Sequence, residues 1–249
     1  MKKTITTLRI FGLLGLVAWS LSVTHEAHAH YLWMETPPSK DQKATQKIEI
    51  YYGEFEESLR EVSGGRLDKV EGLHAWWTGT DNQRREITLE KKSNFFFGTV
   101  KGAKDSIIQA EELNLAVTDL RKYEIGIVKP NLYASVYVGD STENLSAPQS
   151  KTTLGIYPIQ LGEEIVLKVF FKDEALPNAK VNIHAPNTWS KEFNTDASGM
   201  VRFKPPWTGQ HVAEVIYLGK TAGEFKGVPY EAISHRATFA WNIKEGSQK

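Results

Sequence analysis

Histidines are the residues of this chain whose chemistry and spacing best suit a metal site. The sequence has 7 histidines and no cysteine, so imidazoles are its natural ligands for a borderline transition metal. We identify His30, His74, His211 and His235 as candidate metal ligands. Coordination by neutral imidazoles is expected to weaken as the pH falls through about 6, because protons compete for the same nitrogens.

His30 stands out because the residues before it predict that it becomes a mature N-terminus. The opening MKKTITTLR is basic, an apolar run too short to span a bilayer follows, and an A-x-A pattern ends at Ala29. Cleavage after Ala29 would give His30 a free α-amine beside its imidazole. These two nitrogens together can chelate one Ni, Co, Cu or Zn ion. The alternative is that His30 simply follows a permissive cleavage site.

Two of the other histidines are equally compatible with plain packing. His74 lies in the aromatic segment GLHAWWT, where a histidine beside tryptophan is more often packed than ligating. His211 follows a turn at Gly209 and begins a predicted strand, a place where a rigid scaffold can hold a site. Either residue is therefore a candidate ligand or a core histidine.

The last pair of histidines differs in its surroundings. His235 comes four residues after Glu231, and the two would share a face if the segment formed a helical turn. If the segment is extended, only His235 remains a candidate. His184 alternates with Val181 and Ile183, which predicts a solvent-facing side chain and makes it the weakest of the set. The acids Glu54, Glu56 and Glu57 are interpreted as a solvated strand end.

Charge and motif content exclude several classes of function. The whole chain has 30 basic and 30 acidic residues, and no dense basic stripe indicates nucleic-acid binding. No P-loop, dinucleotide glycine fingerprint or nucleophile elbow is present. After the first 29 residues, no stretch is apolar enough to span a membrane. The sequence therefore predicts an exported binding protein rather than an enzyme.

Short segments with alternating or β-branched residues recur along the chain and predict an all-β protein of two sandwiches. Candidate strands are residues 47–52, 72–78, 94–100, 123–128, 132–138, 164–171, 180–185, 200–204, 211–218 and 236–243. Residues 109–120 are predicted to hold a short helical segment. The polar, proline-bearing residues 139–150 are interpreted as a linker. We expect a signal peptide over 1–29, an N-terminal sandwich over 30–150 and a C-terminal sandwich over 151–249.

Residues 160–243 have the order of strands and turns of a known sandwich. The motifs LPNAKV, TDASGMVRF and TGQHVAEV follow one another between predicted strands. This order resembles the transthyretin-like or carboxypeptidase-regulatory-like domain, an Ig-like sandwich. The resemblance implies a fold and carries little about activity, because such sandwiches host many functions.

Three further segments together resemble an exported bacterial family known as a domain of unknown function. They are AHA followed by HYLWMETP, the segment KIEIYYGEFEE, and GVPYEAISHRATFAWNI near the end. Some members of that family are periplasmic nickel- or cobalt-binding accessories to metal uptake. The resemblance implies a metal held by His30 and His235, with His211 as a third partner and His74 as the least certain transfer.

The resulting hypothesis is a periplasmic protein that captures a divalent ion, nickel or cobalt before copper or zinc. It would pass the ion to a membrane metal-uptake system. The main alternative is a binding module without a metal, which recognises a glycan or a partner protein through exposed aromatic residues. A third possibility is an oxidative copper enzyme with an N-terminal histidine chelate, which would need a second histidine in a T-shaped arrangement.

Overall fold

The computed structural model describes residues 30–37, 45–79, 81, 83–103, 105–139, 145–146, 151–205 and 207–243. Within these ranges the regular elements are strands, joined by two short 3-10 helices, η1 (Arg66–Lys69) and η2 (Arg121–Tyr123). The predicted all-β sandwich class is confirmed. Neither of these helices has the length and hydrophobicity needed to cross a membrane. The predicted signal peptide, residues 1–29, lies outside the described residues.

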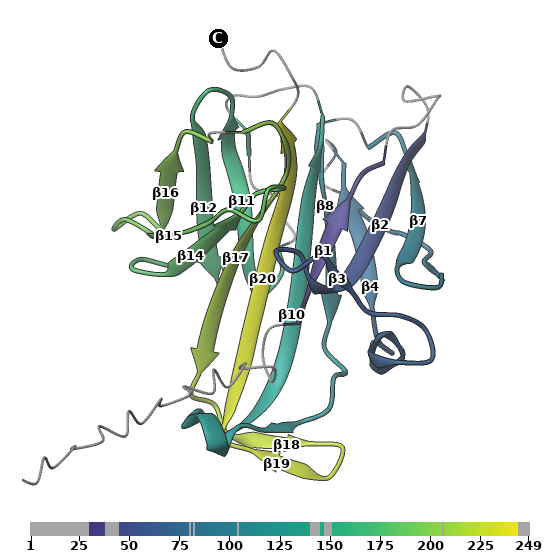
Figure 1. Cartoon of the computed structure of the whole chain (residues 1–249), viewed down its shortest axis with the longest axis vertical. Coiled ribbons are helices and arrows are strands. Elements are labelled where there is room, and N and C mark those ends of the chain that lie inside the picture. Colours follow the sequence, from purple (N-terminus) through teal and green to yellow (C-terminus); the bar gives the residue numbers. More distant parts are fainter. Residues whose placement is uncertain are drawn as a thin grey trace, which may run out of the picture.

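One long sheet runs through the middle of the molecule and draws strands from both halves of the chain (Figure 1). In spatial order its strands are β15 (Ser190–Asn194), β14 (Lys180–His184), β17 (Gly209–Gly219), β20 (Ala232–Ile243), β10 (Ile127–Val138), β8 (Ser106–Glu112), β4 (His74–Thr78) and β5 (Arg84–Glu86). The short strand β9 (Thr118–Asp119) also pairs with β10.

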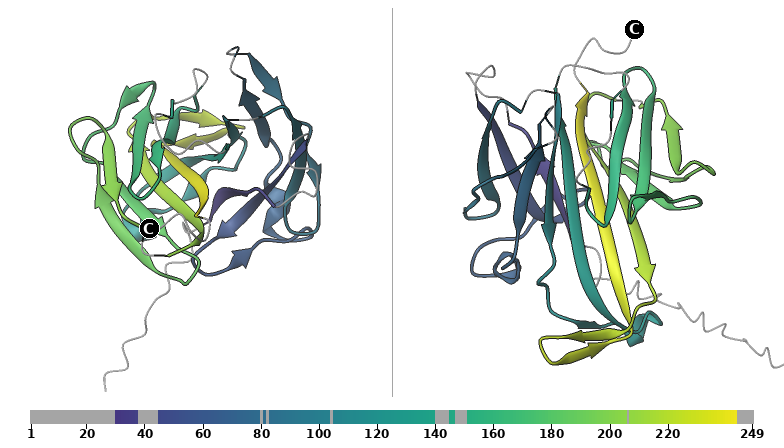
Figure 2. Two further views of the ribbon diagram at one scale, coloured as in Figure 1. Left: turned by 90° about the horizontal axis from the view of Figure 1, so that it is seen from above. Right: turned by 180° about the vertical axis from the view of Figure 1, so that it is seen from behind.

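Two smaller sheets cover this central sheet, one from each half of the chain (Figure 2). The N-terminal sheet contains β1 (Tyr31–Glu35), β2 (Thr45–Glu54), β7 (Phe96–Lys101) and β6 (Glu90–Lys91), with β3 (Leu59–Arg60) beside β2. The C-terminal sheet contains β11 (Leu154–Leu161), β12 (Ile165–Phe171), β13 (Glu174–Ala175) and β16 (Met200–Phe203). A hairpin of β18 (Gly223–Phe225) and β19 (Val228–Tyr230) lies at one end of the long strands.

The two covering sheets pack on opposite faces of the central sheet, because successive side chains of a strand point to opposite faces. On β10, Leu132 and Ala134 belong to the N-terminal core, whereas Tyr133 between them belongs to the C-terminal core. On β20, Ala240 faces the N-terminal core and Phe239 faces the other. The central strands therefore serve two hydrophobic cores at once.

The strands β10 and β20 join the two halves of the chain. They are parallel neighbours, with Val128 in register with Ala232 and Val136 with Ala240. The predicted division between residues 30–150 and 151–249 therefore falls between two cores that share one sheet. Most of the predicted linker over residues 139–150 lies outside the described part of the chain.

Strand β1 is buried on both of its faces. Tyr31, Leu32 and Trp33 have exposed fractions of 0%, 0% and 1%. One edge of β1 pairs with β2, and the ring of Trp33 stacks on that of Tyr51 at 5.2 Å between centroids. Burial of each large apolar side chain contributes about 1.5–3 kcal/mol. The chain is therefore anchored in the core immediately after His30.

Two predictions of secondary structure are wrong. Residues 109–120 form no helix, because β8 runs through Glu112 and pairs with β10 and β4. A short buried apolar run does not distinguish a strand from a helix by its periodicity. Residues 123–128 are not a separate strand, because η2 ends at Tyr123 and β10 continues unbroken from Ile127 past Pro130. Pro130 falls between the residues of β10 that pair with β9 and with β8, where a missing N–H is tolerated.

Candidate functional site

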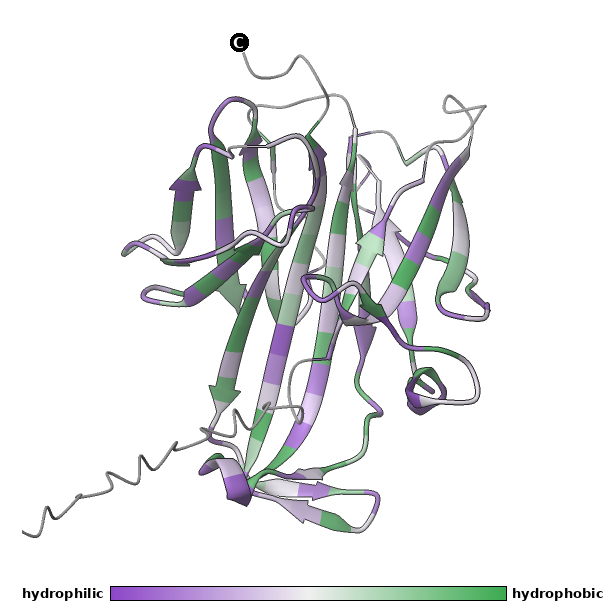
Figure 3. Ribbon diagram, in the orientation of Figure 1, coloured by the Kyte–Doolittle hydropathy of each residue, from purple (hydrophilic) through white to green (hydrophobic). Residues whose placement is uncertain are grey.

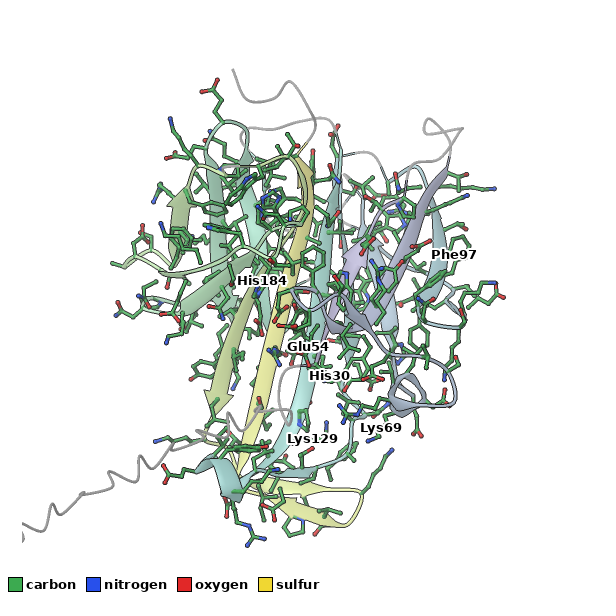
Figure 4. All side chains as sticks on the ribbon, in the orientation of Figure 1. His30, Glu54, Lys69, Phe97, Lys129 and His184 are labelled. Carbon is green, nitrogen blue, oxygen red and sulfur yellow. The ribbon has the colours of Figure 1, made fainter. Side chains whose placement is uncertain are left out.

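His30 lies directly before β1, with a carboxylate beside each of its ring nitrogens. The register that pairs Tyr31 with Gly53 brings His30 opposite Glu54 on β2. His30 Nδ1 is 3.2 Å from Glu54 Oε1, and His30 Nε2 is 2.5 Å from Glu61 Oε1. Figure 4 shows His30 and Glu54 close together in front of the central sheet. The imidazole is therefore held between two acids.

The segment after β2 supplies the second acid and a neighbouring cation. The backbone N–H of Glu61 donates to Tyr52 O at 2.8 Å, which folds this segment back along β2. From η1, Arg66 Nη1 lies 3.3 Å from His30 Nε2 and 4.0 Å from Glu61 Oε1. The ring of Tyr52 lies 5.4 Å from the imidazole and closes another side. The imidazole is therefore enclosed by β2 and the segment that follows it.

Gly53 makes this return of the chain possible. It has a φ of 150°, in the region that favours glycine, and a Cβ at this position would lie 2.1 Å from Leu59 O. Any larger residue would push β3 away from β2. Gly53 thus allows Glu54 and Glu61 to contact the same histidine, His30.

The three side chains of this cluster are only partly open to solvent. His30 is 10% exposed, and Glu54 and Glu61 are 15% exposed. Burial raises the pKa of Glu54, and the charges of Glu56 and Glu57 raise it further, while His30 and Arg236 oppose the shift. Carboxylates gathered in a partly buried place favour a bound cation, because a cation offsets their desolvation and mutual repulsion.

A second polar group borders the cluster on the central sheet. Arg236 of β20 donates to His30 O at 3.4 Å and lies over the ring of Tyr31 at 4.9 Å. Its Nε donates to the buried Glu214, which also contacts His184. Figure 3 shows the corresponding hydrophilic stretch in β20. The surroundings of His30 therefore include residues from both halves of the chain.

His235 lies on the opposite face of the central sheet from His30. Its neighbour Arg236 reaches His30, so His235 points the other way, and its Nδ1 is 2.9 Å from Tyr133 Oη. The rings of Phe171 and Tyr217 pack around it at 5.2 and 6.4 Å. Burial lowers the pKa of His235 to about 4, and the charges of Lys172 and Lys129 add to this shift.

The segment around His235 is extended rather than helical. Glu231 precedes β20 and accepts a hydrogen bond from Ile127 N at 3.0 Å, so its carboxylate binds the backbone of β10. The helical alternative, in which the two residues act together, is therefore not adopted. His235 stands among aromatic rings without a carboxylate partner in the described structure.

His211 is a core histidine. It is 0% exposed, and its ring stacks on Trp241 at 5.3 Å between centroids. Nδ1 lies 3.0 Å from Gly209 O, so Nδ1 carries the hydrogen, because a carbonyl oxygen only accepts. Burial lowers the pKa of the imidazole. Along β17 it lies about 20 Å from Tyr217, the residue in register with His235, given the usual rise per strand residue.

His74 and His184 lie in contrasting places. His74 is exposed on β4 in register with Glu111, and β8 and β10 separate it from β20. The prediction that His184 faces solvent is wrong, because the residue is only 5% exposed. Its ring stacks beside that of Tyr31 at 6.4 Å, so the N-terminal sheet covers this face of β14.

The structure does not bring His30, His74, His211 and His235 to one place. Within the described ranges, no three histidine, aspartate or glutamate side chains form a group suited to a metal ion. The residues that do meet His30 are Glu54 and Glu61. The interpretation of Glu54 as part of a solvated strand end is wrong, because its side chain is 15% exposed and contacts His30. Glu61 was not selected from the sequence. A predicted strand over residues 31–35, paired with residues 49–53, would have placed Glu54 beside His30. No strand was predicted there, so this pairing was not considered.

Comparisons with known proteins add little to this picture. No protein-family model matches the chain, and no curated protein matches it. One similar solved structure comes from a study of how a 1.5-MDa bacterial ice-binding adhesin is retained on the host cell surface. The identity is 8%, the match covers 86% of this chain and 64% of that chain, and the TM-score is 0.25. The chain thus spans less than two thirds of that structure, and a likeness at this level supports no argument about function.

Proposed function

We propose that this protein is a periplasmic binding protein for a divalent transition metal, with His30 as the centre of the site. The observation that carries the proposal is the 3.2 Å separation of His30 Nδ1 and Glu54 Oε1. Two donors that bind one metal at about 2.1 Å and at a right angle lie about 3 Å apart. This pair of atoms can therefore accept a metal ion with little movement.

Glu61 supports the same arrangement from the other side of the imidazole. A histidine that binds a metal through one nitrogen commonly donates its other N–H to a carboxylate, which fixes the tautomer and the ring orientation. Glu61 Oε1 lies 2.5 Å from His30 Nε2 and accepts such a hydrogen bond. With Nε2 protonated, Nδ1 keeps its lone pair for the metal.

The α-amine of His30 is the third donor in this proposal. The described side chains offer no group of three ligands, so His30 and Glu54 need a further donor. Cleavage after Ala29 would release the amine on the same residue as the imidazole. An amine, an imidazole and a carboxylate form a donor set that suits borderline divalent metals. The family resemblance of the sequence, rather than this ligand chemistry, puts nickel or cobalt first, copper second and zinc third.

The biological role proposed for the site is reversible capture. The family resemblance of the sequence suggests an accessory that passes its ion to a membrane metal-uptake system. The partial exposure of His30, Glu54 and Glu61, between 10% and 15%, supports a site from which an ion can leave. No step of catalysis is part of this role.

The test is calorimetric titration with nickel, cobalt, copper and zinc on protein that begins with His30. The matched control is the same chain with its α-amine acetylated, which removes one donor and leaves every side chain in place. We expect the free-amine form to bind nickel at least 100-fold more tightly. Equal affinity of the two forms would remove the amine from the site, and a different first residue in the exported protein would overturn the proposal.

A second candidate function rests on one aromatic pair. Trp189 and Trp207 meet edge to face at 5.2 Å at one end of the C-terminal sandwich, and Trp207 is 37% exposed. Such rings can stack on a sugar or on a partner protein. Binding to a glycan array that survives a chelator and is lost in Trp207→Ala would favour this function over metal capture.

A further inference from the structure

A line of polar contacts crosses the central sheet and ends at the backbone of His30. His184 Nε2 on β14 lies 3.4 Å from Glu214 Oε2 on β17. Glu214 Oε1 accepts a hydrogen bond from Arg236 Nε on β20. Arg236 Nη1 in turn donates to His30 O at 3.4 Å. Three strands of the C-terminal half are therefore linked through side chains to His30, the residue before β1.

These side chains share one face of the central sheet. Their neighbours Ile183, Val215 and Ala237 point into the C-terminal core, so His184, Glu214 and Arg236 point toward the N-terminal sheet. Polar residues on a covered face are costly unless they are paired. Apolar residues could cover β1 at this place, but they could not make the polar contacts that link β20 to His30.

Glu214 holds Arg236 in a single place. Glu214 is 2% exposed, and burial acts to raise its pKa, but the charge of Arg236 and the contact with His184 outweigh burial and lower it. Loss of either partner of a buried pair leaves the other charge uncompensated, which is strongly destabilising. Arg236 therefore has little freedom to leave this position.

From this fixed position the planar guanidinium of Arg236 contacts Glu214, His30 and Tyr31. It donates to Glu214, donates to His30 O and covers the ring of Tyr31 at 4.9 Å. Arginine presents several donors in one rigid fork, whereas a lysine ammonium is a point charge on a flexible stem. A lysine would keep the charge at this position but would not hold the three contacts together.

We infer that Arg236 is a positioning residue, which fixes the backbone of His30 so that its α-amine and Nδ1 face Glu54. This inference rests on the function proposed above and names how the C-terminal half controls that site. Arg236 does not bind the ion in this account. Its charge is balanced by Glu214, so it orients His30 without a net positive charge beside the metal.

Thr238 provides a matched control from the same strand. Its Oγ1 donates to Leu32 O at 2.6 Å, two residues along β1 from the contact of Arg236. Thr238→Val removes a buried hydrogen bond between β20 and β1 without touching His30. It is expected to lower stability while leaving the orientation of the first residue unchanged.

The experiment compares Arg236→Lys with Thr238→Val in protein that begins with His30. Nickel affinity is measured by calorimetry, the ligand geometry by the absorption spectrum of the bound ion, and stability by thermal unfolding. We expect Arg236→Lys to weaken nickel binding at least tenfold and to alter the spectrum, and Thr238→Val to change neither. Equal losses of affinity in the two variants, or none in Arg236→Lys, would overturn the inference.

A readout without metal separates this inference from the proposed function. In the metal-free protein, Arg236→Lys is expected to lower the heteronuclear NOE of the Tyr31 amide, and Thr238→Val to leave it unchanged. An unaltered Tyr31 signal in Arg236→Lys would refute the positioning role whether or not the wild type binds nickel. Failure of the wild type to bind any of the four metals would refute the proposed function alone.

Discussion

His30 and His235 lie on opposite faces of the same central sheet, and their environments differ in almost every respect. His30 has a carboxylate beside each ring nitrogen and is 10% exposed. His235 lies among Tyr133, Phe171 and Tyr217, and its pKa is lowered to about 4. Histidine content alone therefore does not identify a metal site in this protein.

The difference teaches which partners make a histidine available for chemistry. Carboxylates next to an imidazole stabilise either a proton or a metal ion at its nitrogens. Aromatic rings and burial stabilise the neutral imidazole and give it a packing role. On this basis His30 is the candidate ligand, and His211 belongs with His235 because it stacks on Trp241 without exposure.

The strongest way to break this comparison is to remove His235. His235→Ala would leave a space among three aromatic rings and remove one hydrogen-bond partner of Tyr133 Oη. We expect the free energy of unfolding to fall by about 2–4 kcal/mol, in line with other truncations in protein cores. Chemical denaturation measures this loss, and nickel affinity of the folded variant should stay within twofold. A large loss of affinity at unchanged stability would make His235 a ligand after all.

The pH dependence of stability tests the same environment without a cavity. The pKa of His235 is about 4 in the folded protein and 6.5 in its ordinary state. The unfolded chain therefore takes up the proton first as the pH falls, so stability present above pH 6.5 is lost toward pH 4. Between pH 7.5 and 5 this linkage amounts to about 2 kcal/mol. The free energy of unfolding, measured by chemical denaturation at each pH, should fall more steeply with falling pH in the wild type than in His235→Gln. An equal pH dependence in both proteins would argue against a neutral buried imidazole.

Neutralising Glu61, the acid beside His30 Nε2, tests the role of the carboxylates at His30. Glu61→Gln keeps the size of the side chain but replaces a charged hydrogen-bond acceptor of His30 Nε2 with a weaker, neutral one. We expect nickel affinity to fall about tenfold, as for other partners of metal-bound histidines. The exposed Glu57, on the same segment, provides the control Glu57→Gln. An equal effect of both changes would mean that only the overall charge matters.

The smallest effect is expected at His74. Its side chain is exposed on β4, and its nearest charged partner in register is Glu111. His74→Ala should change the free energy of unfolding by less than about 0.5 kcal/mol, as for most surface positions. Nickel affinity measured by calorimetry should not change. A tenfold loss would show that β4 contributes to a site that the geometry around His30 does not include.

Several strands were predictable from local pattern alone. Residues 47–52, 164–171 and 211–218 carry β-branched and aromatic runs, and they lie within or nearly match β2, β12 and β17. The mistaken helix over residues 109–120 and the missed β1 share a cause. Both β1 and β8 are buried on two faces, so neither shows the alternation by which a half-exposed strand is recognised.

The candidate site was predictable only in part. His30 was selected because the processing pattern before it implies a free amine, a property of consecutive residues. Glu54 was not selected, because a charge run has the same composition whether it meets solvent or a histidine. Glu61 was not selected, because it belongs to no motif in the sequence. Their meeting with His30 depends on the pairing of β1 with β2 and on the return of the chain at Gly53.

Local chemistry in the chain thus accounts for the all-β class, for the strands with clear alternation and for the interest of His30. Long-range pairing accounts for the rest, because β-sheet neighbours are set by contacts between residues far apart in sequence. The parallel pairing of β10 with β20 joins the two halves of the chain in one sheet. The sheets that cover its two faces decide that His235 meets Tyr133 and that Arg236 meets His30. Composition and spacing do not show which strands become neighbours. The four histidines could therefore be chosen from the sequence, but it could not show which is a candidate ligand and which only pack in the core.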